Sequence, residues 1–194
     1  MSSGGAEDGA ECGVGVGGGT GSRGGRGVKG AYRLRIGSWN IGSLTSKYIE
    51  LAKILQKRKI NIACVQETRW VGSRAKDVDG YKLWYSRVLR GKNGVGILVD
   101  NHLREAVVEV RQENDRLMTI KLVVGEYILN VVSAYAPHVG LDEEIKRHFW
   151  EGLDEIIRSI LPTERLFIGG DFNGHIGLSA SGYTDVHGGF GLGR

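Results

Sequence analysis

The sequence has few cysteines and no long apolar segment, and both shortages narrow what the protein can be. Among its 194 residues only Cys12 and Cys64 are cysteines, one in a glycine-rich segment and one in an apolar run, so no structural disulfide is expected. No apolar run approaches the roughly 18 residues that a membrane-spanning helix needs. The first 30 residues contain no hydrophobic segment of the kind that a secretory signal carries. We therefore expect an intracellular protein, nuclear or cytoplasmic, that is not secreted and does not contact a membrane.

Residues 1–30 differ in composition from the rest of the chain. They hold 13 of the 32 glycines and almost nothing that could be buried, which predicts a disordered, glycine-rich tail. The segment Arg23–Gly27 resembles the RGG segments that bind single-stranded nucleic acid, although one copy favours a solvated linker over a binding arm. Residues 31–194 are long enough for one domain with a sizeable core.

The excess positive charge lies on this domain. The chain has 26 basic and 22 acidic residues, and residues 1–30 hold three of each, so residues 31–194 carry 23 bases and 19 acids. This mild excess is compatible with a polyanionic partner such as DNA.

Hydrophobic periodicity predicts an ordered series of elements in the domain. Strands are predicted at residues 33–39, 60–66, 81–88, 95–99, 106–111, 117–123, 127–135 and 165–170. A first helix places Tyr48, Leu51, Ala52 and Leu55 on one face, with Thr45 or Ser46 as its cap. A second helix spans about residues 142–160, and its apolar face comprises Ile145, Phe149, Leu153, Ile156, Ile157 and Ile160. This order predicts an α/β protein with mixed sheets and helices on their outer faces.

Four of the predicted strands end in polar motifs. The motifs are Trp39-Asn40, Gln66-Glu67-Thr68, Ala134-Tyr135-Ala136-Pro137 and Gly170-Asp171-Phe172-Asn173. Strand ends along one sheet edge are where α/β folds build their sites. In the last motif the glycines allow close approach of the backbone, and continued extended backbone would place Asp171 and Asn173 on the same side. Carboxylate and amide oxygens suit Mg²⁺, and a second carboxylate can position or activate water.

The four motifs, in this order, resemble the endonuclease/exonuclease/phosphatase superfamily. Within it, the stretches Gln66–Trp70, Tyr135–Glu144 and Gly170–His175 are similar to endonuclease domains of RTE-type (LINE, non-LTR) retrotransposons and to craniofacial development protein 2-like proteins. The resemblance spans about residues 33–194. It implies a two-sheet, four-layer α/β/β/α sandwich, a divalent metal (Mg²⁺ or Mn²⁺), DNA as the partner, and hydrolysis of a phosphodiester.

The resemblance also implies a role for each site residue. Glu67 would be the principal metal ligand and Asn40 would support the metal site. Tyr135 would contact or polarise the scissile phosphate. Asp171 would orient or deprotonate the attacking water, and Asn173 would bind the phosphate or the nucleophile.

Each of these residues alone also has an ordinary interpretation. A strand can end in an asparagine, a surface acid can follow it, a tyrosine can belong to the core, and Asp171 with Asn173 can form an Asx turn. Taken together in family order, they favour an inherited site. His138 and His175 match no catalytic position and are expected to be surface or loop residues, and Cys64 is expected to be a small core residue.

The resemblance further implies a Ser-Asp-His-type motif, with an upstream aspartate that orients its histidine. Nothing after Asp171 supplies either, so we expect residues 31–194 to be a partial domain, incomplete at its C-terminus. Such a domain would leave an apolar face and an unpaired sheet edge exposed. Loss of a positioned acid–base group lowers rates by about 10²–10⁴-fold, so little or no nuclease activity is expected from this chain alone.

Other functions fit the same residues. The chain could be a non-catalytic nucleic-acid- or protein-binding relic, a phosphatase of the same superfamily, or a product without a selected function. The metal site itself does not discriminate between DNA and other phosphate esters, whereas the basic excess and the RTE-like motifs favour DNA. The sequence does not indicate an oligomeric state.

Overall fold

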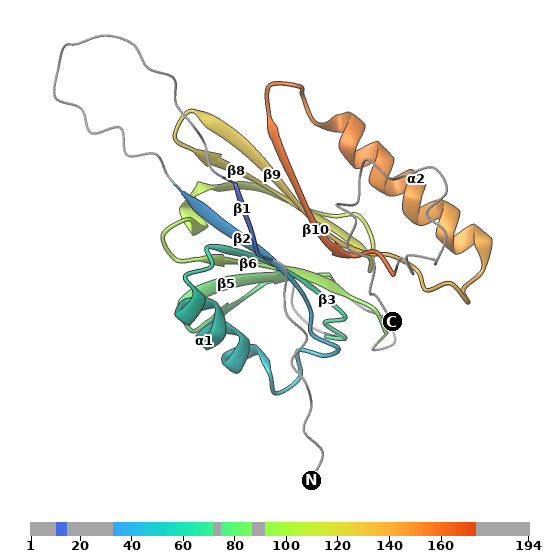
Figure 1. The fold of residues 1–194 in the computed structure, drawn as a ribbon, viewed down its shortest axis with the longest axis horizontal. Coiled ribbons are helices and arrows are strands. Elements are labelled where there is room, and N and C mark those ends of the chain that lie inside the picture. The colour runs from blue at the N-terminus through green and yellow to red at the C-terminus, as the bar shows by residue number, and fades with distance from the viewer. Residues whose placement is uncertain (1–10, 15–32, 72–74, 87–91, 174–194) are drawn as a thin grey trace, which may run out of the picture.

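The computed structural model describes residues 11–14, 33–71, 75–86 and 92–173 of the chain. Within these ranges the strands form two β-sheets that pack face to face, and one helix covers the outer face of each sheet (Figure 1). The layers therefore follow the order helix, sheet, sheet, helix. The α/β/β/α sandwich expected from the sequence is confirmed.

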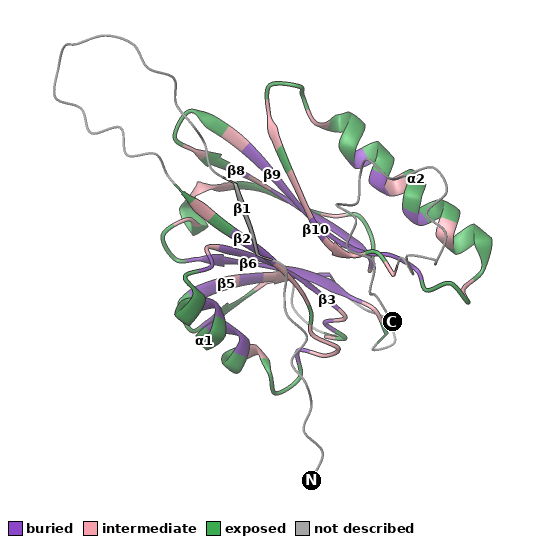
Figure 2. Cartoon of the chain, in the orientation of Figure 1, coloured by how far each residue is buried: buried purple, intermediate pink, exposed green. Residues whose placement is uncertain are grey.

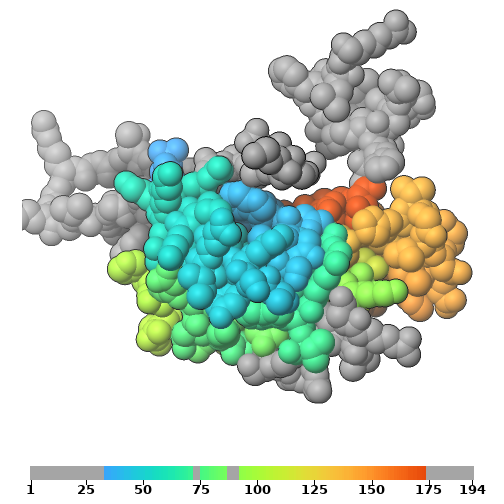
Figure 3. Space-filling model, turned by 90° about the horizontal axis from the view of Figure 1, so that it is seen from below, coloured from blue at the N-terminus to red at the C-terminus, as the bar shows by residue number. Residues whose placement is uncertain are grey.

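The two sheets differ in size. In the described residues, sheet A has six strands, in the spatial order β1 (Glu11–Val14), β2 (Leu34–Asn40), β3 (Ile62–Gln66), β6 (Val95–Asp100), β5 (Tyr81–Tyr85) and β4 (Ala75–Val78). Sheet B has four in the same ranges: β10 (Arg165–Asp171), β9 (Tyr127–Tyr135), β8 (Leu117–Val124) and β7 (Val107–Gln112). The helices are α1 (Tyr48–Arg58), α2 (Glu143–Ser159) and the short 3₁₀ helix η1 (Arg104–Ala106). In Figure 3, the blue and cyan residues of β2 and α1 lie in the middle of the view and the orange residues of α2 lie at its right edge.

Two strand–helix–strand units fix where the functional strand ends lie. β2 and β3 are parallel neighbours joined through α1, and β9 and β10 are parallel neighbours joined through α2. The register pairs Asn40 with Gln66 in sheet A, and Asp171 with Tyr135 in sheet B. Because parallel neighbours end at the same edge of a sheet, each unit delivers two polar loops to one edge.

Apolar side chains fill all three interfaces between the layers (Figure 2). The cluster between the sheets comprises Ile36, Ile62, Cys64, Val95, Ile97 and Val99 from sheet A with Met118, Ile120, Leu122, Leu129, Val131 and Tyr135 from sheet B. Leu51 and Leu55 of α1 pack against sheet A, and Phe149 and Leu153 of α2 pack against sheet B. Burying one such side chain stabilises the fold by about 1.5–3 kcal/mol.

β3 lies at the centre of this packing. It is buried at every position, because β2 and β6 flank it, α1 covers one face and sheet B covers the other. Its continuous apolar run predicted a strand covered on both faces, and this prediction is confirmed. Cys64 in this strand is a fully buried core residue, as expected, and burial raises the pKa of its thiol to about 12.

Two strands were not predicted from the sequence. β1 lies within the expected tail of residues 1–30 and pairs antiparallel with β2, so the predicted absence of structure is wrong at residues 11–14. The rest of that tail lies outside the described residues. β4 pairs antiparallel with β5 at the other edge of sheet A. Both are short edge strands held by backbone hydrogen bonds, which composition and apolar periodicity do not report.

The two helices begin in different ways. Lys47 is the N-cap residue of α1 and makes no capping side-chain hydrogen bond, so the predicted cap by Thr45 or Ser46 is wrong. The φ angle of Ser46 is 64°, which is far from the extended backbone of a capping serine. In α2 the carboxylate of Asp142 accepts a hydrogen bond of 2.7 Å from the backbone N–H of Glu144, as a capping residue does.

α2 buries only part of its predicted apolar face. Ile145 and Ile157 are 43% and 39% exposed, whereas the adjacent Phe149, Leu153 and Ile156 are buried. Four further apolar side chains on and beside α2 and β10 are also exposed: Trp150, Leu161, Leu166 and Phe172. In the described part of the chain, β10 has a paired strand on one side only. Among the described residues, this edge and these side chains are where a further strand could pair, and the partial domain stays a prediction. Neither helix in the described ranges combines the length and hydropathy needed to cross a membrane.

The glycine pair before Asp171 allows β10 to approach both sheets closely. A Cβ atom on Gly169 would lie 2.9 Å from the Cβ and Sγ atoms of Cys64 in sheet A. A Cβ atom on Gly170 would lie 2.6 Å from the backbone oxygen of Ala134 in β9. Only glycine fits at these two positions without displacing its neighbours, so the pair determines where Asp171 lies.

We expect the substitution Gly170→Ala to destabilise the protein by about 1–3 kcal/mol, because the backbone of β9 cannot move away as a flexible side chain could. The matched control is Gly140→Ala, since a Cβ atom there meets nothing within 4 Å. Urea denaturation followed by circular dichroism would measure both variants. Equal free energies of unfolding for the two variants would contradict the close-approach explanation.

Candidate functional site

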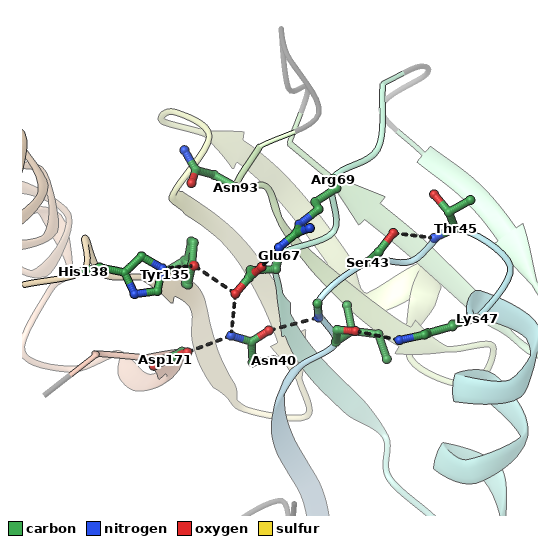
Figure 4. A network of polar contacts seen from close by, with 12 residues as sticks. Asn40, Ser43, Thr45, Lys47, Glu67, Arg69, Asn93, Tyr135, His138 and Asp171 are labelled. Carbon is green, nitrogen blue, oxygen red and sulfur yellow. Dashed lines mark hydrogen bonds and ion pairs between the residues drawn. The ribbon is translucent and has the colours of Figure 1, made fainter. Parts of the chain in front are cut away.

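The polar motifs at the four strand ends meet at one place. Asn40 ends β2, Glu67 follows β3, Tyr135 ends β9 and Asp171 ends β10 (Figure 4). Side-chain hydrogen bonds link these four residues into one network across both sheets. Four of the five predicted site residues therefore lie together.

The Glu67 carboxylate is at the centre of the network. Its Oε1 accepts hydrogen bonds from Asn40 Nδ2 at 3.1 Å and from the Tyr135 hydroxyl at 2.9 Å. Its Oε2 forms an ion pair with Nη2 of Arg69. The Glu67 side chain is 15% exposed, so solvent reaches it only in part.

Asn40 connects the two carboxylates of the site. Its Nδ2 donates to Glu67 Oε1 at 3.1 Å and to Asp171 Oδ2 at 2.7 Å, and its Oδ1 accepts from the backbone N–H of Gly42 at 3.0 Å. Two carboxylates close together repel each other, and a shared amide donor offsets part of that repulsion. Asn40 thus faces the carboxylates with its amide nitrogen and the backbone N–H of Gly42 with its oxygen.

Asp171 and Asn173 belong to a tight turn. The backbone N–H of Asn173 donates to Asp171 Oδ1 at 2.9 Å, and the φ angle of Asn173 is 45°. The sequence left two possibilities open here, continued extended backbone or an Asx turn, and the structure has the Asx turn. The Asn173 side chain instead donates to the backbone oxygen of Ala136 at 2.6 Å, which ties the loop after β10 to the loop after β9.

Tyr135 connects Glu67 to a histidine that was expected to be a surface residue. The Tyr135 hydroxyl lies 2.8 Å from Nε2 of His138, and the two rings meet edge to face with centroids 5.8 Å apart. The hydroxyl has one proton and the Glu67 carboxylate is the stronger acceptor, so Nε2 of His138 must carry the hydrogen that it shares with the phenol oxygen. His138 is exposed and lies in the loop after β9, as expected, but its contact with Tyr135 was not predicted; His175 lies outside the described residues. The sequence feature that could have indicated this contact is the position of His138 three residues after Tyr135, with Pro137 between them.

The backbone between Glu67 and Arg69 is held in an unusual conformation. Glu67 and Arg69 have φ angles of 55° and 52°, in the left-handed region that non-glycine residues rarely occupy. The backbone N–H groups of Thr68 and Arg69 donate to the oxygens of Gly94 and Asn93, each at 3.0 Å. Strained backbone of this kind persists where its surroundings fix it, and it is common at functional sites.

A second arginine lies beneath the network. Arg116 is 9% exposed and donates to the backbone oxygen of Tyr135 and to Oδ1 of Asn93, each at 3.2 Å. Its guanidinium carbon lies 5.2 Å from the centroid of the Tyr135 ring. Asn93 also donates to Asp115 at 2.8 Å. Arg116 therefore supports both the tyrosine and the turn that holds the Glu67–Arg69 backbone. Neither Arg69 nor Arg116 was predicted as a site residue.

The surroundings change the acidity of two groups in opposite ways. Burial opposes ionisation of Glu67, but the hydrogen bonds from Arg69, Asn40 and Tyr135 outweigh it, so the pKa of Glu67 lies below its ordinary value. Burial, followed by the hydrogen bond to Glu67, raises the pKa of Tyr135 to about 12. At neutral pH the site therefore presents an ionised carboxylate beside a neutral phenol.

The donor set suits one hard divalent cation. In the described part of the chain, no group of three or more His, Cys, Asp or Glu side chains is arranged to hold a metal ion. Mg²⁺ commonly takes only one or two carboxylates and keeps several waters. The partly exposed Glu67 and the nearby Asp171 fit that requirement, and Asn40 supports them by donating to both carboxylates.

Comparison with known protein families matches residues 37–192 to the Endonuclease/Exonuclease/phosphatase family. The chain belongs to this family. Craniofacial development protein 2 from Bos taurus is 29% identical over 161 residues, which cover 81% of this chain and 27% of that protein. The chain thus spans about a quarter of the length of the curated relatives that it matches.

Solved structures agree with the family fold. An AP endonuclease from Archaeoglobus fulgidus matches with a TM-score of 0.59 at 22% identity, over 72% of this chain and 57% of that chain. The endonuclease domain of TRAS1, a telomere-specific non-LTR retrotransposon, matches with a TM-score of 0.51 at 23% identity, over 72% of this chain and 59% of that domain. The expected membership of the Endonuclease/Exonuclease/phosphatase family, and its likeness to craniofacial development protein 2 and to retrotransposon endonuclease domains, is confirmed.

The lowered pKa of Glu67 predicts how stability changes in acid. Because the folded state favours the ionised carboxylate, Glu67 stabilises the fold above its ordinary pKa of 4.5, and that contribution is lost as pH falls through the lower pKa of the folded state. We expect the difference in free energy of unfolding between wild type and Glu67→Gln to shrink as pH falls below 4.5. Urea denaturation at several pH values would measure this difference. Because the Glu105 side chain is 85% exposed, the Glu105→Gln variant controls for the loss of one carboxylate. A pH-independent difference would contradict the assignment.

The raised pKa of Tyr135 gives a second test of the network. In Glu67→Gln we expect this pKa to fall from about 12 but to stay above the ordinary value of 10.0, because burial is its larger cause and persists in the variant. Carbon NMR of protein labelled at the tyrosine Cζ atoms would follow the titration, and Tyr135→Phe would identify the signal. A pKa that is the same in wild type and variant would show that Glu67 does not contact the phenol in solution.

Proposed function

We propose that the chain carries a divalent-cation-dependent phosphodiesterase site and that its substrate is DNA. The observation that carries the proposal is the pair of carboxylates, Glu67 and Asp171, held together by Asn40 beside the neutral donor Tyr135. Carboxylates that anchor a cation and accept a proton from water, next to a donor for phosphate oxygens, are the groups that phosphodiester hydrolysis requires.

Each residue has a proposed part in that reaction. Glu67 would hold Mg²⁺ or Mn²⁺, which when bound neutralises charge that develops on the phosphate, and Asn40 would support this site by donating to both carboxylates. Asp171 would orient the attacking water and take up its proton. Tyr135, protonated because of its raised pKa, would donate to a phosphate oxygen by exchanging its hydrogen bond to Glu67 for one to the substrate. Asn173 would contact the phosphate or the nucleophile through its amide oxygen, since its nitrogen is bonded to Ala136.

DNA is proposed as the substrate for two reasons. The domain of residues 31–194 has more basic than acidic residues, and Arg69 places a half-exposed guanidinium beside the carboxylates. Proteins of similar fold support this choice: they include an AP endonuclease, the endonuclease domain of a retrotransposon, and a Neisseria 3′ phosphatase bound to a product DNA hairpin.

The rate is expected to be low. The sequence after Asp171 contains no Ser-Asp-His motif of the kind that the family resemblance implies. Loss of a positioned acid–base group lowers a rate by about 10²–10⁴-fold. We therefore expect little nuclease activity from this chain alone, even with the cation bound.

Nicking of supercoiled plasmid in Mg²⁺ or Mn²⁺ tests the proposal. Nicked product should form slowly, should require the cation, and should be lost in Glu67→Gln and in Asp171→Asn, while Glu105→Gln should behave as wild type. Nicking that persists equally in all variants would contradict the site. Rapid nicking that Glu67→Gln abolishes would instead contradict the expected loss of rate.

The same samples separate the alternative functions. DNA that is retained in a gel-shift experiment but never nicked would favour the non-catalytic binding module. Release of phosphate from an inositol phosphate or a nucleotide, without plasmid nicking, would favour a phosphatase.

A further inference from the structure

We propose that Arg69 is a built-in counter-ion of Glu67, which must leave the carboxylate before a divalent cation can bind and is then free to bind a phosphodiester. The inference rests on the proposed function in one respect, namely that Glu67 is the ligand of that cation. It adds a residue that couples cation binding to substrate binding within the same site.

The two oxygens of Glu67 are not equivalent. Oε1 accepts two hydrogen bonds, from Asn40 Nδ2 at 3.1 Å and from the Tyr135 hydroxyl at 2.9 Å, and these use both of its lone pairs. Oε2 contacts only Arg69 among the described residues. The oxygen best placed to accept a cation is thus the one that a guanidinium already occupies.

Arg69 can move away, unlike the other arginine of the site. Its side chain is 50% exposed, and within the described residues only its Nη2 is engaged, by Glu67. Arg116 is 9% exposed and is bonded through both terminal nitrogens, to Tyr135 and to Asn93. Arg69 is therefore the mobile cation of the site, whereas Arg116 is fixed.

The backbone limits how far Arg69 can go. Its φ angle of 52° and the hydrogen bond of 3.0 Å from its backbone N–H to Asn93 hold its Cα atom in place, so only the side chain swings. A released guanidinium therefore stays within one side-chain length of the carboxylates. Its planar set of N–H donors matches the oxygens of a phosphate diester.

Two cations that need the same carboxylate oxygen bind in competition. Arg69 weakens the affinity of Glu67 for a divalent cation, and by reciprocity the cation weakens the ion pair. Because release of Arg69 also frees a phosphate-binding group, cation and phosphodiester should each strengthen the binding of the other. Arg69 would thus supply a positive coupling between the two ligands.

Metal affinity measured without DNA and without turnover tests the first step. We expect Arg69→Gln to bind Mn²⁺ about three- to tenfold more tightly than wild type, as followed by electron paramagnetic resonance, with Mg²⁺ as competitor. Arg69→Lys should stay close to wild type because it keeps the competing charge. The matched control is Arg111→Gln, since Arg111 is 46% exposed and pairs with Glu113 at 2.9 Å; it changes the net charge equally and should leave the Mn²⁺ affinity unchanged.

Each outcome decides between the inference and the proposed site. Equal Mn²⁺ affinity in wild type and Arg69→Gln, together with loss of binding in Glu67→Gln, would overturn the counter-ion role and leave the metal site standing. The same affinity in wild type and Glu67→Gln would overturn the proposed site itself. If the Arg69→Gln variant binds Mn²⁺ under conditions where the wild-type protein binds none, the inference would be supported most strongly.

Binding of a short DNA duplex tests the second step. Saturating Mn²⁺ should strengthen duplex binding more in the wild-type protein than in the Arg69→Gln variant, because only the wild-type protein releases a guanidinium. Fluorescence anisotropy at constant ionic strength would measure both affinities. Arg111→Gln should show the wild-type increment. An increment of the same size in Arg69→Gln and wild type would show that Arg69 does not couple the two ligands.

Discussion

Two side-chain hydrogen bonds cross between the sheets at the site, and they hold its two carboxylates together. Asn40 of sheet A donates to Asp171 of sheet B at 2.7 Å, and Tyr135 of sheet B donates to Glu67 of sheet A at 2.9 Å. Each sheet thus carries one carboxylate and one neutral donor, and the donor bonds to the carboxylate of the other sheet. The site exists only while the two sheets keep their packing distance, which the apolar cluster between them maintains.

Small residues near the site determine the packing distance between the two sheets. Gly169 lies where any side chain would meet Cys64, so the backbone of β10 approaches β3 as closely as the sulfur atom allows. The buried thiol, whose pKa of about 12 keeps it protonated, fills this space without adding a charge. Core packing and site geometry are thus determined by the same pair of residues, since Asp171 follows two positions later.

The sequence predicted the architecture well, because its signals are strong for long, periodic elements. The central strands, both helices and the four strand-end motifs lie where periodicity and motif order placed them. The edge strands β1 and β4 escaped prediction because they are short and lack an apolar periodicity, and their backbone pairing with β2 and β5 leaves no such signal. Arg69 and His138 were missed for another reason: their roles come from contacts with Glu67 and Tyr135 that only a left-handed backbone and a proline-containing loop create. For Asp171 and Asn173 the sequence left an extended backbone and an Asx turn both open, and the local hydrogen bond of the turn decided between them.

Because β10 is paired on one side only in the described residues, the half of the site that carries Asp171 should open more often than the half that carries Glu67. Glu67 follows β3, which is hydrogen-bonded on both sides and buried at every position. Asp171 ends β10, which in the described residues pairs with β9 alone and carries the exposed side chain of Leu166. Local opening costs least where pairing and burial are least, so amide protons of β10 should exchange with solvent sooner than those of β3. The carboxylate proposed to handle water therefore lies on the more mobile half of the site, and the one proposed to hold the cation lies on the rigid half.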